Sequence, residues 1–136
     1  MLKKIFTISA ILLFSASTVL AGPDVNMKEG LWEITSGVKM PGMSMPPSTH
    51  TQCITKDDLV PQKAQPGQEC QATDVQYKGN TVTWKIECSG QSGVMTGTGR
   101  ITYNGDSFVG QVEITMPGQG MKMTTHMKGR RIGDCK

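Results

Sequence analysis

Methionine is the residue type whose number and spacing in this sequence are most unusual for chemistry. The 136-residue chain contains ten methionines, and the form Met-Pro-Gly-x-x-Met occurs twice, at residues 40–45 and 116–121. Thioether sulfur is a soft ligand that suits Cu(I) or Ag(I), and the same side chain is a flexible apolar group that fills irregular spaces. The two runs therefore predict a binding rim, and its methionines are Met40, Met43, Met45, Met116 and Met121.

Two uses of this rim stay open at the level of the sequence. The first is a lip that binds an apolar ligand or an envelope protein. The second is a soft-metal site built from Met43, Met45 and Met121. Met43 and Met45 lie between prolines and are hard to explain as core. Met123 and Met127 alternate with polar residues and are better explained as core. A purely structural envelope module is a further alternative, and no cofactor is expected.

The four cysteines predict cross-links. Cys53, Cys70, Cys88 and Cys135 form an even set with no Cys-x-x-Cys spacing, so two disulfides are expected in an oxidising compartment, and zinc is not. The strand directions derived below place Cys70 and Cys88 at the same end of a sheet, which favours the pairing Cys70–Cys88 with Cys53–Cys135. The rival pairing, Cys53–Cys70 with Cys88–Cys135, has a shorter first loop. Strict alternation also places Cys70 off the face that carries Trp84.

Enzyme chemistry finds little support in the sequence. The two histidines are His50 and His126, and His126 falls on the polar face of its predicted strand. The sequence contains no Gly-x-Ser-x-Gly elbow and no phosphate-binding glycine loop. The pair Asp57 and Asp58 is typical of the acidic first turn of a helix. We therefore expect a protein that is not an enzyme.

The first residues predict export. Lys3 and Lys4 precede a largely apolar run, and Val19-Leu20-Ala21 supplies small or compact residues for cleavage after Ala21. Residues 1–21 are thus expected to be a cleaved signal peptide, and residues 22–136 a single periplasmic domain with no transmembrane span. Removing the two lysines leaves 12 basic residues of the original 14, against 11 acidic ones. A chain with nearly zero net charge and no basic stripe is not expected to bind nucleic acid.

The elements that would position these residues are strands. Asn104-Gly105 lies between two alternating runs and predicts a type I′ turn, with Tyr103 opposite Asp106 and Ile101 opposite Phe108. The turn at residues 117–120 predicts Met116 opposite Met121. A further hairpin at Gly79-Asn80 predicts Tyr77 opposite Val82 and Val75 opposite Trp84.

Together with strands over 31–40 and 48–55, these hairpins give about seven antiparallel strands. Short strands with Asn-Gly and Pro-Gly turns are typical of an all-β fold, and the long meander favours a small barrel or half-barrel. One short helical turn is expected over residues 56–60, where Thr55 and Asp58 resemble a capping box. Trp32 and Trp84 fall on the apolar side of their strands and are expected to be buried. In this arrangement the two Met-Pro-Gly turns lie at the same end of the sheet.

Several short motifs follow one another in an order that resembles a known family. They are Gly30-Leu31-Trp32-Glu33, Met40-Pro41-Gly42-Met43, Thr51-Gln52-Cys53, Val82-Thr83-Trp84, Met95-Thr96-Gly97-Thr98-Gly99 and Gly129-Arg130-Arg131-Ile132-Gly133-Asp134-Cys135. The series resembles a family of small exported proteobacterial proteins known as a domain of unknown function, number thirty-six seventeen. The resemblance covers nearly the whole of residues 22–136. It implies a periplasmic protein, and it supplies no catalytic or binding residues.

Overall fold

The computed structural model describes residues 24–61, 69–91, 93–116, 118 and 120–136. The predicted signal segment lies outside these residues. The described chain forms one antiparallel sheet of eight strands. They are β1 (Gly30–Met40), β2 (Met43–Ser44), β3 (Ser48–Ile54), β4 (Glu69–Lys78), β5 (Thr81–Gly90), β6 (Gly93–Asn104), β7 (Ser107–Met116) and β8 (Met121–Gly133).

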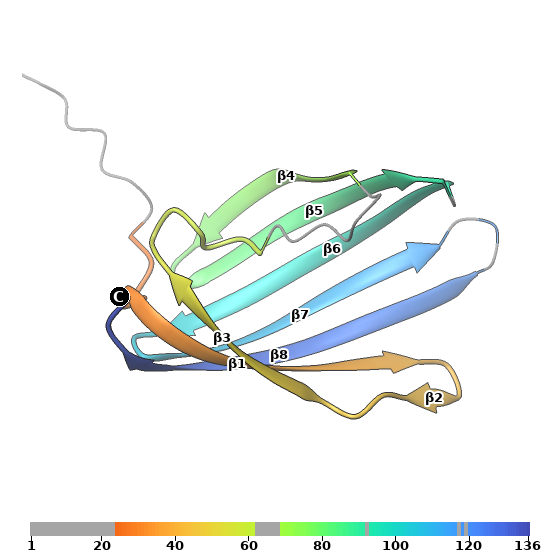
Figure 1. The fold of residues 1–136 in the computed structure, drawn as a ribbon. Helices are drawn as coiled ribbons and strands as arrows, with labels where there is room; N and C mark the ends of the chain where they lie inside the picture. The colour runs from red at the N-terminus through yellow and green to blue at the C-terminus, as the bar shows by residue number, and fades with distance from the viewer. Residues whose placement is uncertain (1–23, 62–68, 92, 117, 119) are drawn as a thin grey trace, which may run out of the picture.

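The prediction of an all-β antiparallel fold is confirmed. The strand order is β2-β1-β8-β7-β6-β5-β4, and β3 pairs with β1 on the side that β2 also occupies. Among the described strands, β4 pairs with neither β2 nor β3, so the sheet is not closed. The sheet curves into an open trough, with β3 crossing in front of it (Figure 1).

The predicted helical turn at residues 56–60 is wrong, and no helix is present in the described residues. The Asp58 N–H does donate to the Thr55 carbonyl at 3.0 Å, but this bond closes a single turn that is not continued. The Thr55 hydroxyl donates to the Asp58 carboxylate at 3.0 Å and so does not cap a backbone N–H. Leu59 is buried one residue later, so tertiary packing takes the chain out of the helical path.

The register between β6 and β7 differs from the prediction by two residues. Tyr103 lies opposite Phe108 and Ile101 opposite Gly110, so the central turn residues are Gly105 and Asp106. Of these two, only Gly105 has a positive φ, 71°, as in a type II′ turn. The predicted type I′ turn is therefore wrong. Because the shift is two residues, every side chain keeps its predicted face.

Of the two other predicted registers, one is confirmed and one is correct only near its turn. Between β7 and β8 the prediction is confirmed, with Met116 opposite Met121. Between β4 and β5, Tyr77 does lie opposite Val82, but the pairing shifts between Thr73 and Gln76. The predicted pair of Val75 with Trp84 is thus wrong. Asp74 at the shift has φ 52°, which marks a β-bulge with one extra residue in β4.

This bulge explains how the disulfide pairing agrees with the strand faces. One extra residue reverses the alternation of β4, so Cys70 lies opposite Cys88 and Ala72 opposite Ile86. The favoured pairing is confirmed: Cys70 is bonded to Cys88, and Cys53 to Cys135. Two disulfides are the mark of an oxidising, non-cytoplasmic environment.

The well-packed core lies at one end of the trough. Trp32 is 0 % exposed and Trp84 2 % exposed, which confirms their predicted burial. Phe108 stacks at 5.6 Å from both Trp32 and Tyr103. Facing glycines make room for these rings: a Cβ at Gly99 would lie 2.2 Å from the Trp84 ring, and one at Gly129 equally close to Phe108.

Candidate ligand-binding hollow

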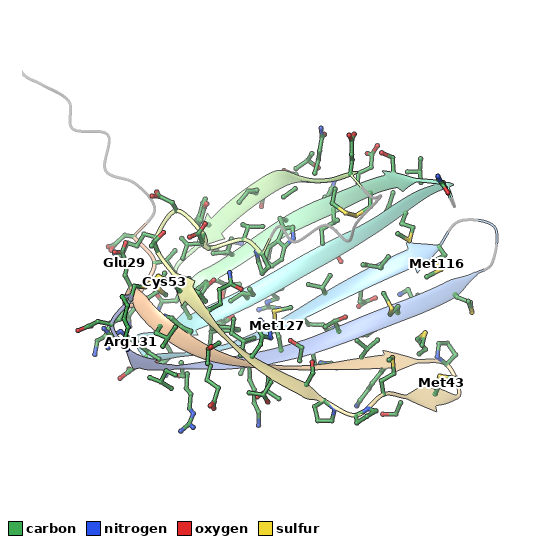
Figure 2. All side chains as sticks on the ribbon, in the orientation of Figure 1. Glu29, Met43, Cys53, Met116, Met127 and Arg131 are labelled. Atoms are coloured by element: carbon green, nitrogen blue, oxygen red, sulfur yellow. A yellow bond between two sulfur atoms is a disulfide. The ribbon has the colours of Figure 1, made fainter. Side chains whose placement is uncertain are left out.

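The two ends of the trough are built differently. We call the end with the turns at residues 78–81 and 104–107 the closed end, since the aromatic core lies there. The other end, with the turns at residues 40–43, 90–93 and 116–121, is called the open end. Lys39 lies opposite both Ser44 and Thr124, so both Met-Pro-Gly turns belong to the open end. Figure 2 shows Met43 and Met116 at this end, and Glu29, Cys53 and Arg131 at the closed end.

A hollow of about 470 Å³ occupies the inner face of the sheet toward the open end. Its floor consists of half-buried side chains from the neighbouring strands β5 to β8, and the Cys70–Cys88 disulfide and Ala72 form one flank. None of the described residues that line it carries a charge. Its lining is Pro61, Cys70, Gln71, Ala72, Ile86, Cys88, Met95, Val112, Ile114, Met116, Met123, Thr125 and Met127.

The hollow exists because β3 does not reach the open end. β3 starts at Ser48, opposite Ser36, and runs from there to the closed end, where Ile54 packs into the core. Beyond Ser36, the two-residue strand β2 is the only described strand that pairs with β1 on that side. Inner-face residues such as Ile114 and Met123 are therefore left half-exposed. A ligand that covers these half-exposed apolar side chains would remove them from water, which is favourable.

A second cavity of about 450 Å³ lies beside the first and has a different chemistry. Both cavities are lined by Pro61 and Met127, but the second also touches His50, Asp57 and Asp58. Tyr103 lies in its wall and donates its hydroxyl to the Leu59 carbonyl at 2.8 Å. Burial, and to a smaller extent the nearby Tyr77, raises the pKa of the Tyr103 hydroxyl above its usual range.

The structure places the predicted rim methionines in three settings. Met116 lines the hollow itself. Met40 is half-buried at the end of β1. Met43, Met45 and Met121 are exposed at the tips of the open end, with Met43 the most exposed at 62 %. That these residues bind a ligand stays a prediction.

Three further methionines line the hollow and were not among the predicted rim residues. They are Met95, Met123 and Met127. The alternation of their strands correctly puts them on the inner face. The core role predicted for Met127 is confirmed in part, because Met127 packs against the core cluster as well as lining the hollow, whereas Met123 is half-exposed. The missing signal was the length of β3, since the same inner position is core where β3 covers it and cavity lining where β3 is absent.

A soft-metal site remains a prediction. Among the described residues, no group of three or more His, Cys, Asp or Glu side chains is arranged to hold a metal ion. That observation does not concern thioethers. His126 is exposed on the outer face of β8, as its alternation predicts.

The motifs at the two ends of the chain meet in a polar clamp at the closed end. The Arg131 guanidinium donates to the Glu29 carbonyl at 2.8 Å, and the Glu29 carboxylate accepts from the Lys56 N–H at 3.0 Å. Arg130 forms an ion pair with Glu33 at 2.9 Å. These contacts join β1, β8 and the segment after β3, next to the Cys53–Cys135 disulfide. The motif residues here are thus explained by architecture.

This combination of motifs, cross-links and sheet agrees with the comparison with known families. Residues 27–135 match the model of a family described as "Protein of unknown function (DUF3617)". The chain belongs to this family. No curated protein matches the chain, and neither does any solved structure. Within the described residues of this DUF3617 protein, no helix has the length and apolar character to cross a bilayer.

Proposed function

We propose that this DUF3617 protein is a non-enzymatic binding module of the periplasm that holds an apolar ligand in the hollow at its open end. The observation that carries the proposal is a cavity of about 470 Å³ whose lining, over the described residues, is uncharged. Ligand sites of this kind are concave, mostly apolar and about 300–1,000 Å³ in volume. The cleaved signal over residues 1–21 would deliver the chain to the compartment that its two disulfides require.

The methionines suit a ligand of variable shape. Four of them, Met95, Met116, Met123 and Met127, line the hollow from three adjacent strands. An unbranched thioether side chain has several rotatable bonds and adapts its packing to the group that it contacts. A hollow of this composition selects for apolar volume over a fixed hydrogen-bond pattern.

Native mass spectrometry tests the proposal directly. The protein purified from the periplasm is measured intact and then denatured, and the expected result is a bound apolar molecule that is released on denaturation. The uncharged dye N-phenylnaphthylamine is a second probe, because its fluorescence rises in an apolar site. No retained mass together with no dye binding would contradict the proposal and would favour a purely structural module.

Two valines of β7 supply a matched pair of variants. Val112 lines the hollow, whereas Val109 lies on the outer face and is 65 % exposed. Val112→Lys places a charge in the hollow and is expected to weaken dye binding by about tenfold or more. Val109→Lys is expected to leave it unchanged. If Val112→Lys does not fold, Thr125→Trp fills the hollow with an aromatic ring and has the same expected effect.

A further inference from the structure

Four of the eight large apolar side chains that are exposed among the described residues lie at the tips of the open end. Met43 is 62 % exposed, Met45 50 %, Val94 48 % and Met121 44 %. They come from three separate connections: Met43 and Met45 lie between β1 and β3, Val94 is the second residue of β6, and Met121 begins β8. Large exposed apolar residues that converge in this way mark a contact surface.

Charged residues are absent from the turns that carry these apolar side chains and are present at the closed end. The sequence over residues 40–47, 89–95 and 116–121 contains no Asp, Glu, Lys or Arg. The closed end carries the ion pairs of Lys28 with Asp106 and of Arg131 with Asp134. These three turns can therefore leave water without removing a charge of their own from it, which is the main cost of entering an apolar medium.

Three charged side chains of the described residues lie close to these tips. Glu69 begins β4, lies opposite Ser89 and is exposed. Lys39 is next to Met40 and is exposed, and Lys122 is next to Met121 and pairs with Glu113 at 3.0 Å. Long lysine side chains keep their ammonium group at a polar boundary while their stems lie along apolar surface. Two lysines and one carboxylate at this level suit the polar headgroup layer of a bilayer.

We propose that the open end docks on a lipid bilayer, with Met43, Met45, Val94 and Met121 in the interfacial layer. Three turn tips around the mouth of a hollow can all contact a surface that is flat and deformable, as a bilayer is. Methionine is also enriched at protein interfaces, but the tips lack the Trp, Tyr and Arg that dominate binding hot spots, so a protein partner is the poorer match. The mouth of the hollow then faces the bilayer, since Met116 lines the hollow and lies opposite Met121 at the tip.

One consequence of this docking rests on the proposed function: the ligand of the hollow is a membrane lipid or another amphiphile of the bilayer. Such a molecule would pass between the hollow and the bilayer without exposing its apolar part to water. Interfacial binding scales with the buried apolar area, to which attraction between basic residues and anionic lipid adds.

Flotation of the full mature protein with phosphatidylcholine vesicles tests the docking. The wild type is expected to float with the vesicles. The double variant Met43→Asp with Val94→Asp changes two separate turns and is expected to lower the bound fraction by about tenfold or more. Val109→Asp is the matched control, because Val109 is as exposed as Met43 but lies on the outer face; it is expected to float like the wild type.

The two proposals fail in different ways. Val112→Lys is expected to lose dye binding and to keep flotation, because Val112 lies inside the hollow. A wild type that binds the dye but does not float overturns the docking alone. Flotation that appears only when the vesicles contain envelope proteins also overturns it, in favour of a protein partner. An equal loss in Val109→Asp would remove the open end as the docking surface, and circular dichroism excludes unfolding as the cause.

Discussion

The closed and the open end of the trough are made from the same strands, yet one is filled and the other is hollow. At the closed end, β3, the segment around Leu59 and the residues before β1 cover the inner face, and the aromatic rings interlock. At the open end the same inner face continues with methionine and aliphatic residues that nothing described covers completely. The comparison teaches that the length of β3 decides the role of each half of the sheet. The half that β3 covers forms the core that stabilises the fold, and the half that it leaves uncovered is available for binding.

The largest expected effect comes from one truncation made at both ends. Ile101 is 1 % exposed in the closed-end core, whereas Ile114 is half-exposed in the hollow. Ile101→Ala is expected to lower the free energy of unfolding by about 2–5 kcal/mol, since it leaves a cavity in packed surroundings. Ile114→Ala is expected to cost about 1 kcal/mol, because part of its side chain already meets water.

Chemical denaturation monitored by tryptophan fluorescence measures both costs. If Ile101→Ala does not fold, Ile101→Val and Ile114→Val give the same comparison at a smaller scale. Equal costs at the two positions would contradict the division of the trough into a packed and a hollow half.

A second prediction concerns the turn that holds the closed end. Gly105 has φ 71°, accepts from the Lys28 N–H at 2.9 Å and donates to the Asn26 carbonyl at 2.8 Å. Gly105→Val forces a β-branched residue to positive φ and is expected to cost about 1–3 kcal/mol in denaturation experiments. Asn104→Ala is the control, because Asn104 has no positive φ, and its cost is expected to be small. A larger loss for Asn104→Ala would restore the type I′ turn.

That turn shows how far the sequence predicts the fold. Alternation fixes which face each residue of β6 and β7 occupies, because the face depends only on parity. It does not distinguish two registers that differ by two residues. Asn-Gly-Asp is compatible with both hairpin turns, and every side chain lies on the same face in either register. The turn that forms is the one in which Gly105 also bonds to Asn26 and Lys28, a contact with a distant segment that local rules do not contain.

The candidate site was predictable to a smaller extent. Parity places Met95, Met123 and Met127 on the inner face, but whether an inner residue is core or cavity lining depends on what lies above it. The bulge at Asp74 is a second limit: the off-face position of Cys70 under strict alternation indicates an irregularity in β4 but does not locate it, and the bulge turns Cys70 toward Cys88. Pairing the cysteines by strand direction succeeded because direction is unaffected by a one-residue bulge.

A third prediction tests the bond that fixes the segment after β3 over the core. Tyr103→Phe removes the hydrogen bond from the Tyr103 hydroxyl to the Leu59 carbonyl and is expected to cost about 1 kcal/mol. The variant should also change the response to alkali. Burial raises the pKa of the Tyr103 hydroxyl, so above about pH 10 the unfolded chain releases this proton and the folded chain keeps it.

Stability from this group is therefore fully present below about pH 10 and falls as the pH rises further. Denaturation midpoints measured across this range should fall less steeply in Tyr103→Phe than in the wild type. Identical slopes would mean that Tyr103 ionises as readily in the folded protein as in the unfolded one.

The smallest expected effect on stability comes from oxidising the open end. A peroxide transfers one oxygen atom to a thioether and leaves water, which turns methionine into its polar sulfoxide. Met43 is 62 % exposed, whereas Met27 in the closed-end core is 4 % exposed. Timed treatment with hydrogen peroxide, followed by peptide mass spectrometry, should therefore show Met43, Met45 and Met121 oxidised well before Met27.

Because those three side chains already meet water, the free energy of unfolding should change by no more than about 0.5 kcal/mol. Oxidation of Met27 at the rate of Met43 would mean that the closed end opens as readily as the open end, and the contrast between them would not hold in solution.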